Sequence, residues 1–276
     1  GMSTKAEDVV EHILITTNHH TILFFTNLGR VFPLKAWQIA ETGRTSKGAH
    51  ISNLIPMDAN EIVTALIKVR EYDPERFLFM ATKKGMVKKT QLSEFSSMPK
   101  RGIIALKLRK GDELIGVKFT EGERNIILGT AKGKAIVFDE EEVRSTGRAT
   151  QGVLGIKLQK GDFVVGMDKL RKDSEVLVVS SEGYGKRTST EEYRPQSRNG
   201  KGLITMKVTE KTGDVIGIKV VRPDQELMLV TTEGLVIRTN VADISVISRN
   251  TQGVMLMKTK PEDKVAALAT VTLKES

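Results

Sequence analysis

Arginine and lysine recur at one place in this 276-residue sequence, in the few residues that precede a glycine. In four of five such segments an arginine stands four positions before the glycine. The segments end at Gly48, Gly102, Gly152, Gly202 and Gly253. Guanidinium and ammonium groups neutralise phosphates, and small neighbours such as Ser, Thr, Asn and Gly let backbone N–H groups approach a phosphate. The segments therefore predict a surface that binds a polyanion.

A second set of cations follows an earlier glycine in three places, as in Lys88-Lys89, Lys186-Arg187 and Arg238. One basic segment alone is more often a solvated turn than a binding site. Recurrence at one place in every repeat favours a binding role, because strand packing requires no cation there. The residues predicted to contact this polyanion are Arg44, Lys47, Lys88, Lys89, Lys100, Arg101, Arg148, Lys186, Arg187, Arg198, Lys201, Arg238 and Arg249.

The whole composition agrees with a polyanionic partner. The formal net charge is +9 and the pI is about 9.6, which favours nucleic acid over an anionic membrane surface. No apolar run approaches the roughly 20 residues of a membrane span, and no signal peptide is visible. Because cations that repeat regularly along a curved rim would follow a bent duplex, we expect a cytoplasmic protein that binds double-stranded DNA and does not associate with a membrane.

Residues with catalytic potential form no recognisable group. The chain has no cysteine, which excludes disulfides, thiolate metal sites and a cysteine nucleophile. It has no phosphate-binding P-loop, and the adjacent His19 and His20 would face opposite sides of a strand. We predict no catalytic residue, metal or cofactor in this chain. Tyr184 and Tyr193 are expected to be packing or rim residues, and Tyr72 has no catalytic partner in the sequence. A recurring aspartate is expected to hydrogen-bond a turn, at Asp112, Asp162, Asp214 and Asp263.

The elements that carry the basic segments repeat about every fifty residues. A turn glycine opens each unit after an apolar run, and it stands 19, 17, 19, 19 and 19 residues before the second glycine. The turn glycines are Gly29, Gly85, Gly133, Gly183 and Gly234. Glycine supplies the positive φ that such a hairpin needs. A fixed period of this length with four short strands per unit predicts an all-β fold of propeller-like, four-stranded blades.

The five complete units are expected at residues 18–69, 74–120, 123–170, 173–222 and 224–273, in one domain over residues 1–276. The third strands are expected at residues 103–108 and 153–158 in the second and third units. Residues 7–17 resemble the fourth strand of a unit whose first three strands are missing. We interpret them as the tail strand of a preceding blade, which favours an origin within a longer chain.

Four stretches carry a resemblance to a known family, and the match runs essentially from end to end. They are residues 79–90, 110–117, 183–188 and 248–254. On these residues the chain resembles the C-terminal domain of the A subunit of bacterial type IIA topoisomerases, DNA gyrase and topoisomerase IV. The resemblance implies a β-pinwheel, whose blades exchange strands with their neighbours and whose rim binds and bends DNA. It also implies a bacterial, nucleoid-associated protein.

The same resemblance sets expectations for the partners and the chemistry. The A subunit pairs with a B subunit, and the catalytic tyrosine, ATP and Mg²⁺ belong to other parts of the enzyme. The isolated domain is expected to be a monomer. In gyrases of this family the first blade carries the gyrase box, Gln-Arg-Arg-Gly-Gly-Lys-Gly. Its nearest counterpart here is at residues 196–202, which lie in the fourth complete unit and keep five of the seven residues.

Two alternatives stay open at this point. The parent protein is either a gyrase, which wraps DNA, or a topoisomerase IV, which bends and selects it. A propeller-type interaction scaffold is the competing class, with a basic rim that meets an acidic protein partner.

Overall fold

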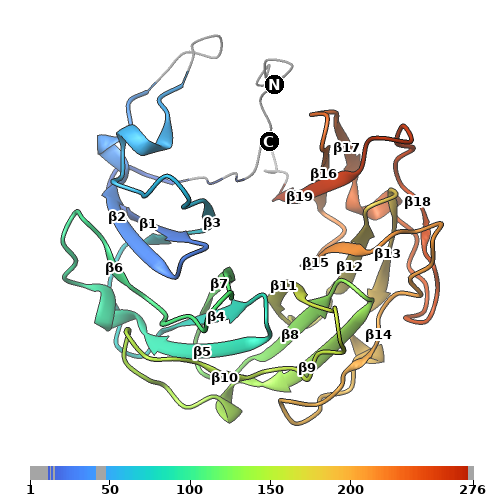
Figure 1. Cartoon of the computed structure of the whole chain (residues 1–276), viewed down its shortest axis with the longest axis horizontal. Helices are drawn as coiled ribbons and strands as arrows, with labels where there is room; N and C mark the ends of the chain where they lie inside the picture. The colour runs from blue at the N-terminus through green and yellow to red at the C-terminus, as the bar shows by residue number, and fades with distance from the viewer. Residues whose placement is uncertain (1–11, 13, 15, 42–47, 273–276) are drawn as a thin grey trace. The chain divides into compact units, whose positions relative to one another are not determined.

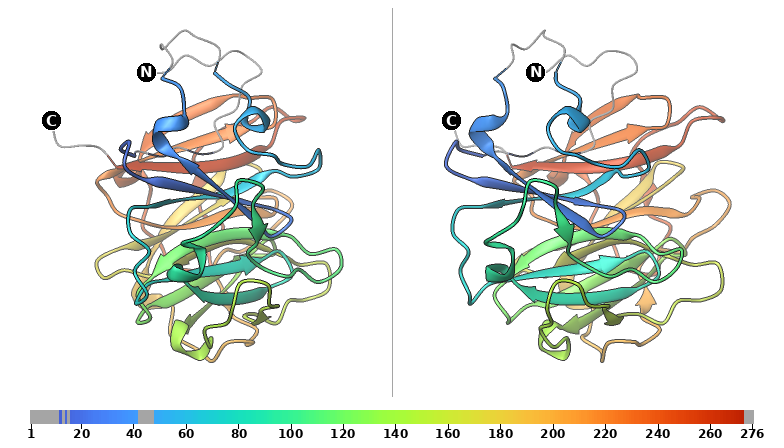
Figure 2. Two further views of the ribbon diagram at one scale, coloured as in Figure 1. Left: turned by 90° about the vertical axis from the view of Figure 1, so that its left-hand side faces the viewer. Right: turned by 60° about the vertical axis from the view of Figure 1, so that its left-hand side comes forward.

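The structure is a computed structural model that describes residues 12, 14, 16–41 and 48–272. Within these residues the fold is all-β. Nineteen strands form five sheets, and short 3₁₀ helices of three or four residues connect them. The strands of each sheet lie side by side (Figures 1 and 2). The all-β, five-bladed class predicted from the glycine period is confirmed, whereas most of the tail strand expected at residues 7–17 lies outside the described residues.

Each repeat supplies three long or medium strands to its own blade. Blade one contains β1 (Thr21–Thr26), β2 (Arg30–Lys35) and β3 (Val63–Val69); blade two contains β4 (Phe77–Thr82), β5 (Met86–Gln91) and β7 (Leu114–Thr120). Blade three contains β8 (Asn125–Thr130), β9 (Lys134–Asp139) and β11 (Val164–Lys169); blade four contains β12 (Glu175–Ser180), β13 (Tyr184–Ser189) and β15 (Val215–Val221). Blade five contains β16 (Gln225–Thr231), β17 (Val236–Asn240) and β19 (Val265–Thr272).

The fourth strand of each of the first four blades comes from the following repeat. Blades one to four receive β6 (Ile103–Ile104), β10 (Val153–Leu154), β14 (Leu203–Ile204) and β18 (Val254–Met255), each beside the second strand of the hairpin. The exchange of strands that the family resemblance implies is therefore confirmed. These exchanged strands pair over only two residues, so the six-residue third strands expected from the sequence are wrong in length.

The turn glycines explain how the exchanged strands attach. All five have positive φ, between 75° and 84°. A Cβ atom on Gly183 would lie 2.0 Å from the Met257 carbonyl oxygen, so a side chain would push the incoming strand away. The Gly183 carbonyl accepts the Leu256 N–H at 2.8 Å. Glycine therefore serves both the turn and the docking of the next repeat.

Recurring aspartates close the same turns. The Asp112 carboxylate accepts the Thr82 hydroxyl at 2.6 Å and the Lys84 N–H at 2.9 Å. Asp263 does the same for Thr232 and for the Glu233 N–H. The predicted turn role is confirmed for Asp112, Asp162 and Asp263, whereas the Asp214 carboxylate forms an ion pair with Lys132 at 3.1 Å.

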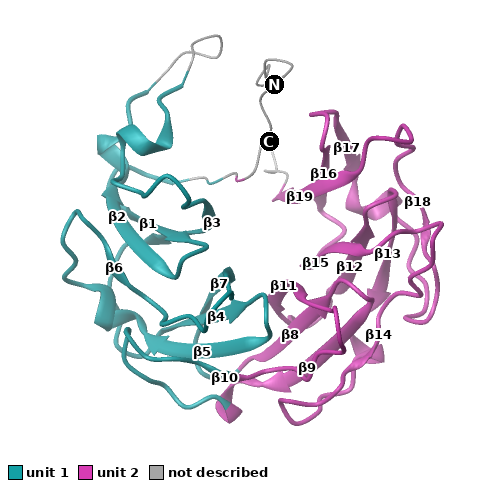
Figure 3. Ribbon diagram, in the orientation of Figure 1, with its two compact units in different colours: residues 1–4, 14–123, 143–153 teal, residues 5–13, 124–142, 154–276 magenta. Residues whose placement is uncertain are grey.

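The described residues fall into two compact units, shown in Figure 3. Residues 14–123 and 143–153 belong to the first unit, and residues 124–142 and 154–272 to the second. The core of the first unit includes the edge-to-face pair Phe25 and Phe95, whose ring centroids are 6.2 Å apart. The core of the second unit is mostly aliphatic, with Val178 and Leu229 fully buried. Each unit thus has its own hydrophobic core.

Candidate nucleic-acid interface

Four basic loops lie within the described residues, and we name them by their spans: 97–102, 147–152, 197–202 and 248–253. Arg44 and Lys47, predicted to contact DNA in the first repeat, lie outside the described residues. The segments around the loops follow the second strand of the preceding blade through backbone hydrogen bonds. These bonds are Thr146 N to Lys89 O at 2.9 Å, Gln196 N to Val137 O at 2.7 Å and Ile247 N to Arg187 O at 2.9 Å. Loops 147–152, 197–202 and 248–253 are therefore each positioned by a neighbouring repeat.

Two of the loops rest on a buried lysine. Lys88 on β5 is 1% exposed and Lys186 on β13 is 0% exposed. The Lys88 Nζ donates to Ala105 O at 2.7 Å and to Arg148 O, which belongs to loop 147–152. These two side chains were predicted to contact DNA directly, and the structure places them beneath the loops instead. The reason is that the next repeat covers the face of the strand from which they project.

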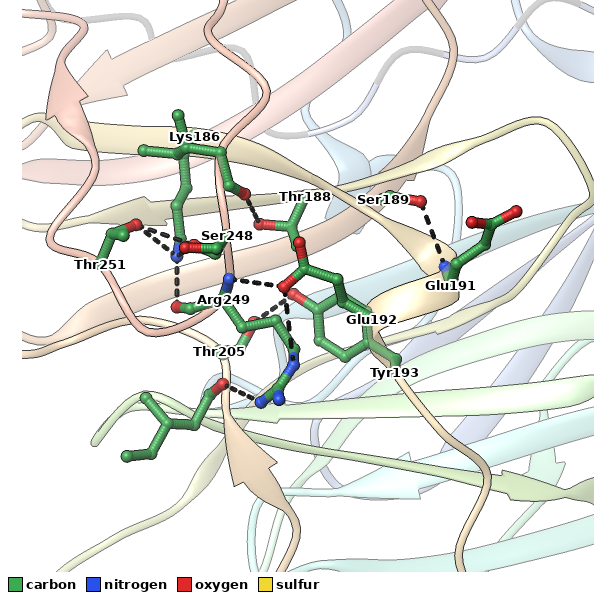
Figure 4. A network of polar contacts seen from close by, with 12 residues as sticks. Lys186, Thr188, Ser189, Glu191, Glu192, Tyr193, Thr205, Ser248, Arg249 and Thr251 are labelled. Carbon is green, nitrogen blue, oxygen red and sulfur yellow. Dashed lines mark hydrogen bonds and ion pairs between the residues drawn. The ribbon is translucent and has the colours of Figure 1, made fainter.

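The site at Lys186 is the more extensive of the two (Figure 4). Its Nζ donates to Ser248 O at 2.7 Å, to Arg249 O and to Thr251 Oγ1 at 2.9 Å. The Thr251 hydroxyl in turn donates to Ser248 O at 2.9 Å. Three of the six residues in loop 248–253 are thus held by one ammonium group.

Burial changes the acidity of both lysines. It lowers the pKa of Lys88 from 10.5 to about 8. The Glu94 carboxylate opposes this shift and the Arg148 guanidinium adds to it. Burial lowers the pKa of Lys186 to about 8 as well, with Glu192 raising it and Arg249 lowering it. An ammonium in a dry site loses hydration, which favours the neutral amine.

The neighbours of these lysines are also interior. Lys89 is 7% exposed, and its Nζ lies 5.0 Å from the centre of the Phe77 ring. Arg187 is equally buried, and its guanidinium donates to Ile244 O at 2.8 Å and to Ala242 O at 3.0 Å. It also pairs with Glu175 at 3.4 Å. The structure therefore gives both residues internal contacts, which direct phosphate binding would have to displace.

The remaining predicted cations reach the surface. Lys100, Arg101, Lys201 and Arg238 are exposed, and Arg238 pairs with Glu226 on the adjacent strand. Arg148, Arg198 and Arg249 are half-buried.

Each of two loop arginines, Arg198 and Arg249, uses some of its N–H donors within the protein and keeps others for an external acceptor. Arg198 donates from Nε to Glu142 O at 3.1 Å and from Nη1 to Leu154 O at 3.0 Å. Arg249 donates from Nη1 to Ile204 O at 2.8 Å, and its Nε lies 3.9 Å from the Glu192 carboxylate. Because a guanidinium has five N–H donors, each arginine keeps donors for a further acceptor.

The sequence reasoning missed one set of lysines. The fifth residue after each loop glycine is an exposed lysine in four repeats: Lys107, Lys157, Lys207 and Lys258. Backbone bonds place three of them beside the next loop, from Lys107 N to Thr150 O, Lys157 N to Gly200 O and Lys207 N to Thr251 O, at 2.9 to 3.0 Å. A regular glycine-to-lysine spacing of five was the available signal. The result is a repeated group that combines a loop arginine with a lysine of the preceding repeat.

A tyrosine lies under the last of these groups. Tyr193 is 3% exposed, and its hydroxyl lies 2.6 Å from Thr205 Oγ1. Burial raises its pKa to about 12. The guanidinium of Arg249 stands 6.0 Å from the centre of its ring. The prediction that this tyrosine packs is confirmed.

The family model described as "DNA gyrase C-terminal domain, beta-propeller" matches residues 20–70, 76–121, 124–171, 174–222 and 225–272. The chain belongs to the DNA gyrase C-terminal domain family. The five matched segments correspond to the five sequence repeats, each of which supplies the three longer strands of one blade, and together they cover most of the sequence.

Two curated relatives and one solved structure show the extent of the similarity. The chain is 50% identical over 276 residues to the DNA gyrase A protein of Clostridium acetobutylicum, and 53% identical over 275 residues to that of Halalkalibacterium halodurans. Each match covers the whole of this chain and 33% of the length of the relative. A crystal structure of the C-terminal domain of DNA topoisomerase IV shares the fold, with a TM-score of 0.88 at 24% identity; the match covers 98% of this chain and 85% of that one.

Two further properties of the described residues are relevant to this gyrase domain. No helix among them is long and apolar enough to cross a membrane. Within the same residues no three His, Asp or Glu side chains gather as a metal site would require.

Proposed function

We propose that this chain binds the backbone of duplex DNA through its basic loops and the lysines that follow them, and that it bends the bound duplex. The observation that carries the proposal is the repeated pairing of a loop arginine with an exposed lysine, as at Arg249 and Lys207. Phosphates along a duplex recur regularly, so a repeated cationic group suits them better than an isolated ligand. The net charge of +9 supports the same partner.

Contact is expected with phosphates and with DNA shape, because the exposed groups at the loops are arginine, lysine and small polar side chains. Bending 20–30 base pairs by 40–90° costs on the order of 1–6 kcal/mol. Several phosphate contacts must offset that cost. The repetition of the group in successive blades supports such a multiple contact.

Within a longer protein, the bound DNA would be presented to a catalytic core for strand passage and control of supercoiling. We propose that this part of the A subunit of a type II topoisomerase is itself non-catalytic. The use of ATP and Mg²⁺, like the pairing with a B subunit, would belong to other segments. The family membership supports this assignment, and the relatives extend well beyond the span of this chain.

The first test measures the affinity for a 40-base-pair duplex by fluorescence anisotropy between 50 and 300 mM salt. Six phosphate contacts would give a slope of log K against log salt of about −5. Random sequences should bind about equally well. No binding at 50 mM salt would refute the proposal, whereas binding to polyglutamate in preference to DNA would favour a scaffold for an acidic protein.

The second test measures bending. A nicked plasmid is ligated in the presence of increasing amounts of the chain, and its topoisomers are then separated. DNA that follows a curved path acquires writhe, so the topoisomer distribution should shift in proportion to the protein added. A large shift of one sign would indicate wrapping of the gyrase kind, and a small shift would indicate bending of the topoisomerase IV kind. An unchanged distribution would leave DNA binding without bending.

A further inference from the structure

We propose that Lys88 and Lys186 are positioning residues that turn loops 147–152 and 248–253 into pre-organised phosphate sites. This inference rests on the proposed DNA binding and goes beyond it, because it assigns two buried residues a role in the contact. Their side chains touch no DNA in this scheme. They act through the loop backbone and through their charge.

The geometry at the two sites is the same although they lie in different units. Both lysines occupy the third position after a turn glycine, Gly85 and Gly183. Both donate from Nζ to the carbonyl of the loop arginine, Arg148 or Arg249. The loops share the sequence Arg-x-Thr-Gln-Gly. The other two described loops have different sequences and rest on apolar side chains at the equivalent position.

A loop that binds phosphate must direct its cationic side chains outward. The buried ammonium holds the carbonyls of Arg148, Ser248 and Arg249 on the inner side, and the Arg249 N–H donates to the Glu192 carboxylate at 3.0 Å, so the site is organised around the side-chain cations. A pre-organised loop loses less conformational entropy when DNA binds. The ammonium also adds a positive charge beneath the loop, where little water screens it.

The charged groups around each lysine come from two elements. The 3₁₀ helix after β5 (Leu92–Phe95) provides Glu94, and loop 147–152 provides Arg148. The 3₁₀ helix after β13 (Thr190–Glu192) provides Glu192, and loop 248–253 provides Arg249. Each lysine therefore faces one carboxylate and one guanidinium. With pKa values of about 8, both ammonium groups lose their protons in a range where exposed lysines keep theirs.

The experiment compares Lys88→Met, Lys186→Met and the double variant with the wild-type chain, with the same 40-base-pair duplex as probe. Loss of one phosphate contact per loop should reduce the salt slope by about 0.9 and the affinity at 0.1 M salt by about eightfold for each single variant. Hydrogen exchange at residues 147–152 and 248–253 should accelerate in the variants. Lys84→Met is the matched control, since Lys84 also donates to a carbonyl, Lys110 O at 2.7 Å, in a hairpin turn. It should bind DNA within about twofold of wild type.

A pH series on the wild-type chain tests the same inference without any substitution. Affinity at constant salt should fall as the pH rises from 7 to 9.5, with a midpoint near the pKa of the two lysines, and the double variant should show no such fall. A folded double variant with wild-type affinity and slope would overturn the inference, and so would a flat wild-type pH profile. If the wild-type chain bound no duplex at low salt, the proposed function itself would fail.

Discussion

The described basic loops fall into two classes that differ in what lies beneath them. Loops 147–152 and 248–253 rest on the buried ammonium groups of Lys88 and Lys186. Loops 97–102 and 197–202 rest on Phe32 and Ile136, both 1% exposed or less. We call the residue beneath each loop its seat; the four seats are Phe32, Lys88, Ile136 and Lys186, and each is the third residue after a turn glycine. One position in the fold therefore supports the same kind of surface loop by two kinds of chemistry.

Loops 97–102 and 197–202, which rest on apolar residues, are held by their backbone conformation and by hydrogen bonds from surface groups. In loop 197–202, Asn199 adopts a φ of 64° and Gly202 a φ of 72°, and Gly200 lies against Ile136. In loop 97–102, Arg30 donates to Arg101 O at 3.1 Å from outside. In loops 147–152 and 248–253 the buried lysine instead donates to loop carbonyls from the interior of the protein. The buried lysines therefore coincide with loops whose carbonyls turn inward, and the apolar residues with a loop whose Arg101 carbonyl is satisfied from the surface.

The largest effect is expected when a lysine is placed on an apolar seat. Ile136→Lys should destabilise the protein by about 3–5 kcal/mol, because an ammonium without dedicated acceptors would be buried. Urea denaturation measures this change. Ile136→Met is the control, and its cost should be below about 1.5 kcal/mol. If Ile136→Lys were as stable as wild type, the loop sequence would not decide which seat is used.

The reverse substitution should cost less. Lys186→Met removes the charged donor from the carbonyls of Ser248 and Arg249, which keep the Thr251 hydroxyl and the Thr251 N–H respectively, and a hydrogen bond to a charged group contributes about 1.5–3 kcal/mol. We expect a loss of about 2 kcal/mol in urea denaturation. Lys88→Met should cost less, because Lys88 serves two acceptors and Lys186 serves three. Equal costs for the two variants would indicate that the third acceptor contributes nothing.

The pH dependence of stability should also distinguish a protein with buried lysines beneath its loops from one with apolar residues there, and this effect should be smaller than those of the substitutions above. The folded pKa of each lysine is about 8 and the unfolded value is 10.5. Between these values the unfolded chain binds more protons, so stability rises with pH. The melting temperature of wild type, relative to that of the double methionine variant, should therefore increase by a few degrees from pH 7.5 to pH 10. A relative decrease would mean that burial does not depress these pKa values.

The smallest effect is expected within one lysine-seated loop. Thr251→Val removes an acceptor for Lys186 and a donor to Ser248 O, with a change of shape limited to the hydroxyl. The expected cost is about 1 kcal/mol in thermal or urea denaturation. Thr251→Ser keeps the hydroxyl and should recover most of the loss. Equal stability of the valine and serine variants would show that the hydroxyl network is dispensable.

The sequence predicted those features that single residues require. A hairpin with positive φ requires glycine, so Gly85 and its counterparts located every blade. The loops were found because their cations repeat. Their anchoring to the preceding blade could not be found in this way, since it depends on which repeat covers which strand.

The two buried lysines illustrate what was missed. On an ordinary edge strand, one residue of the pair Lys88-Lys89 would face solvent. Here all of β5 except Gln91 is buried, because the following repeat covers it. The exposed lysines such as Lys207 escaped notice for the opposite reason, since they belong to a strand that was assigned to its own blade.

The exchange of strands places the sequence repeat and the blade out of step by one strand. Removing or duplicating a stretch of about fifty residues, from one loop glycine to the next, would therefore leave each hairpin with an equivalent incoming strand. Only the last blade is different: within the described residues, its sheet ends at β17 without a fourth strand. A module bounded by two loop glycines carries one incoming strand and one hairpin together, so its removal or duplication creates no new exposed sheet edge inside the array.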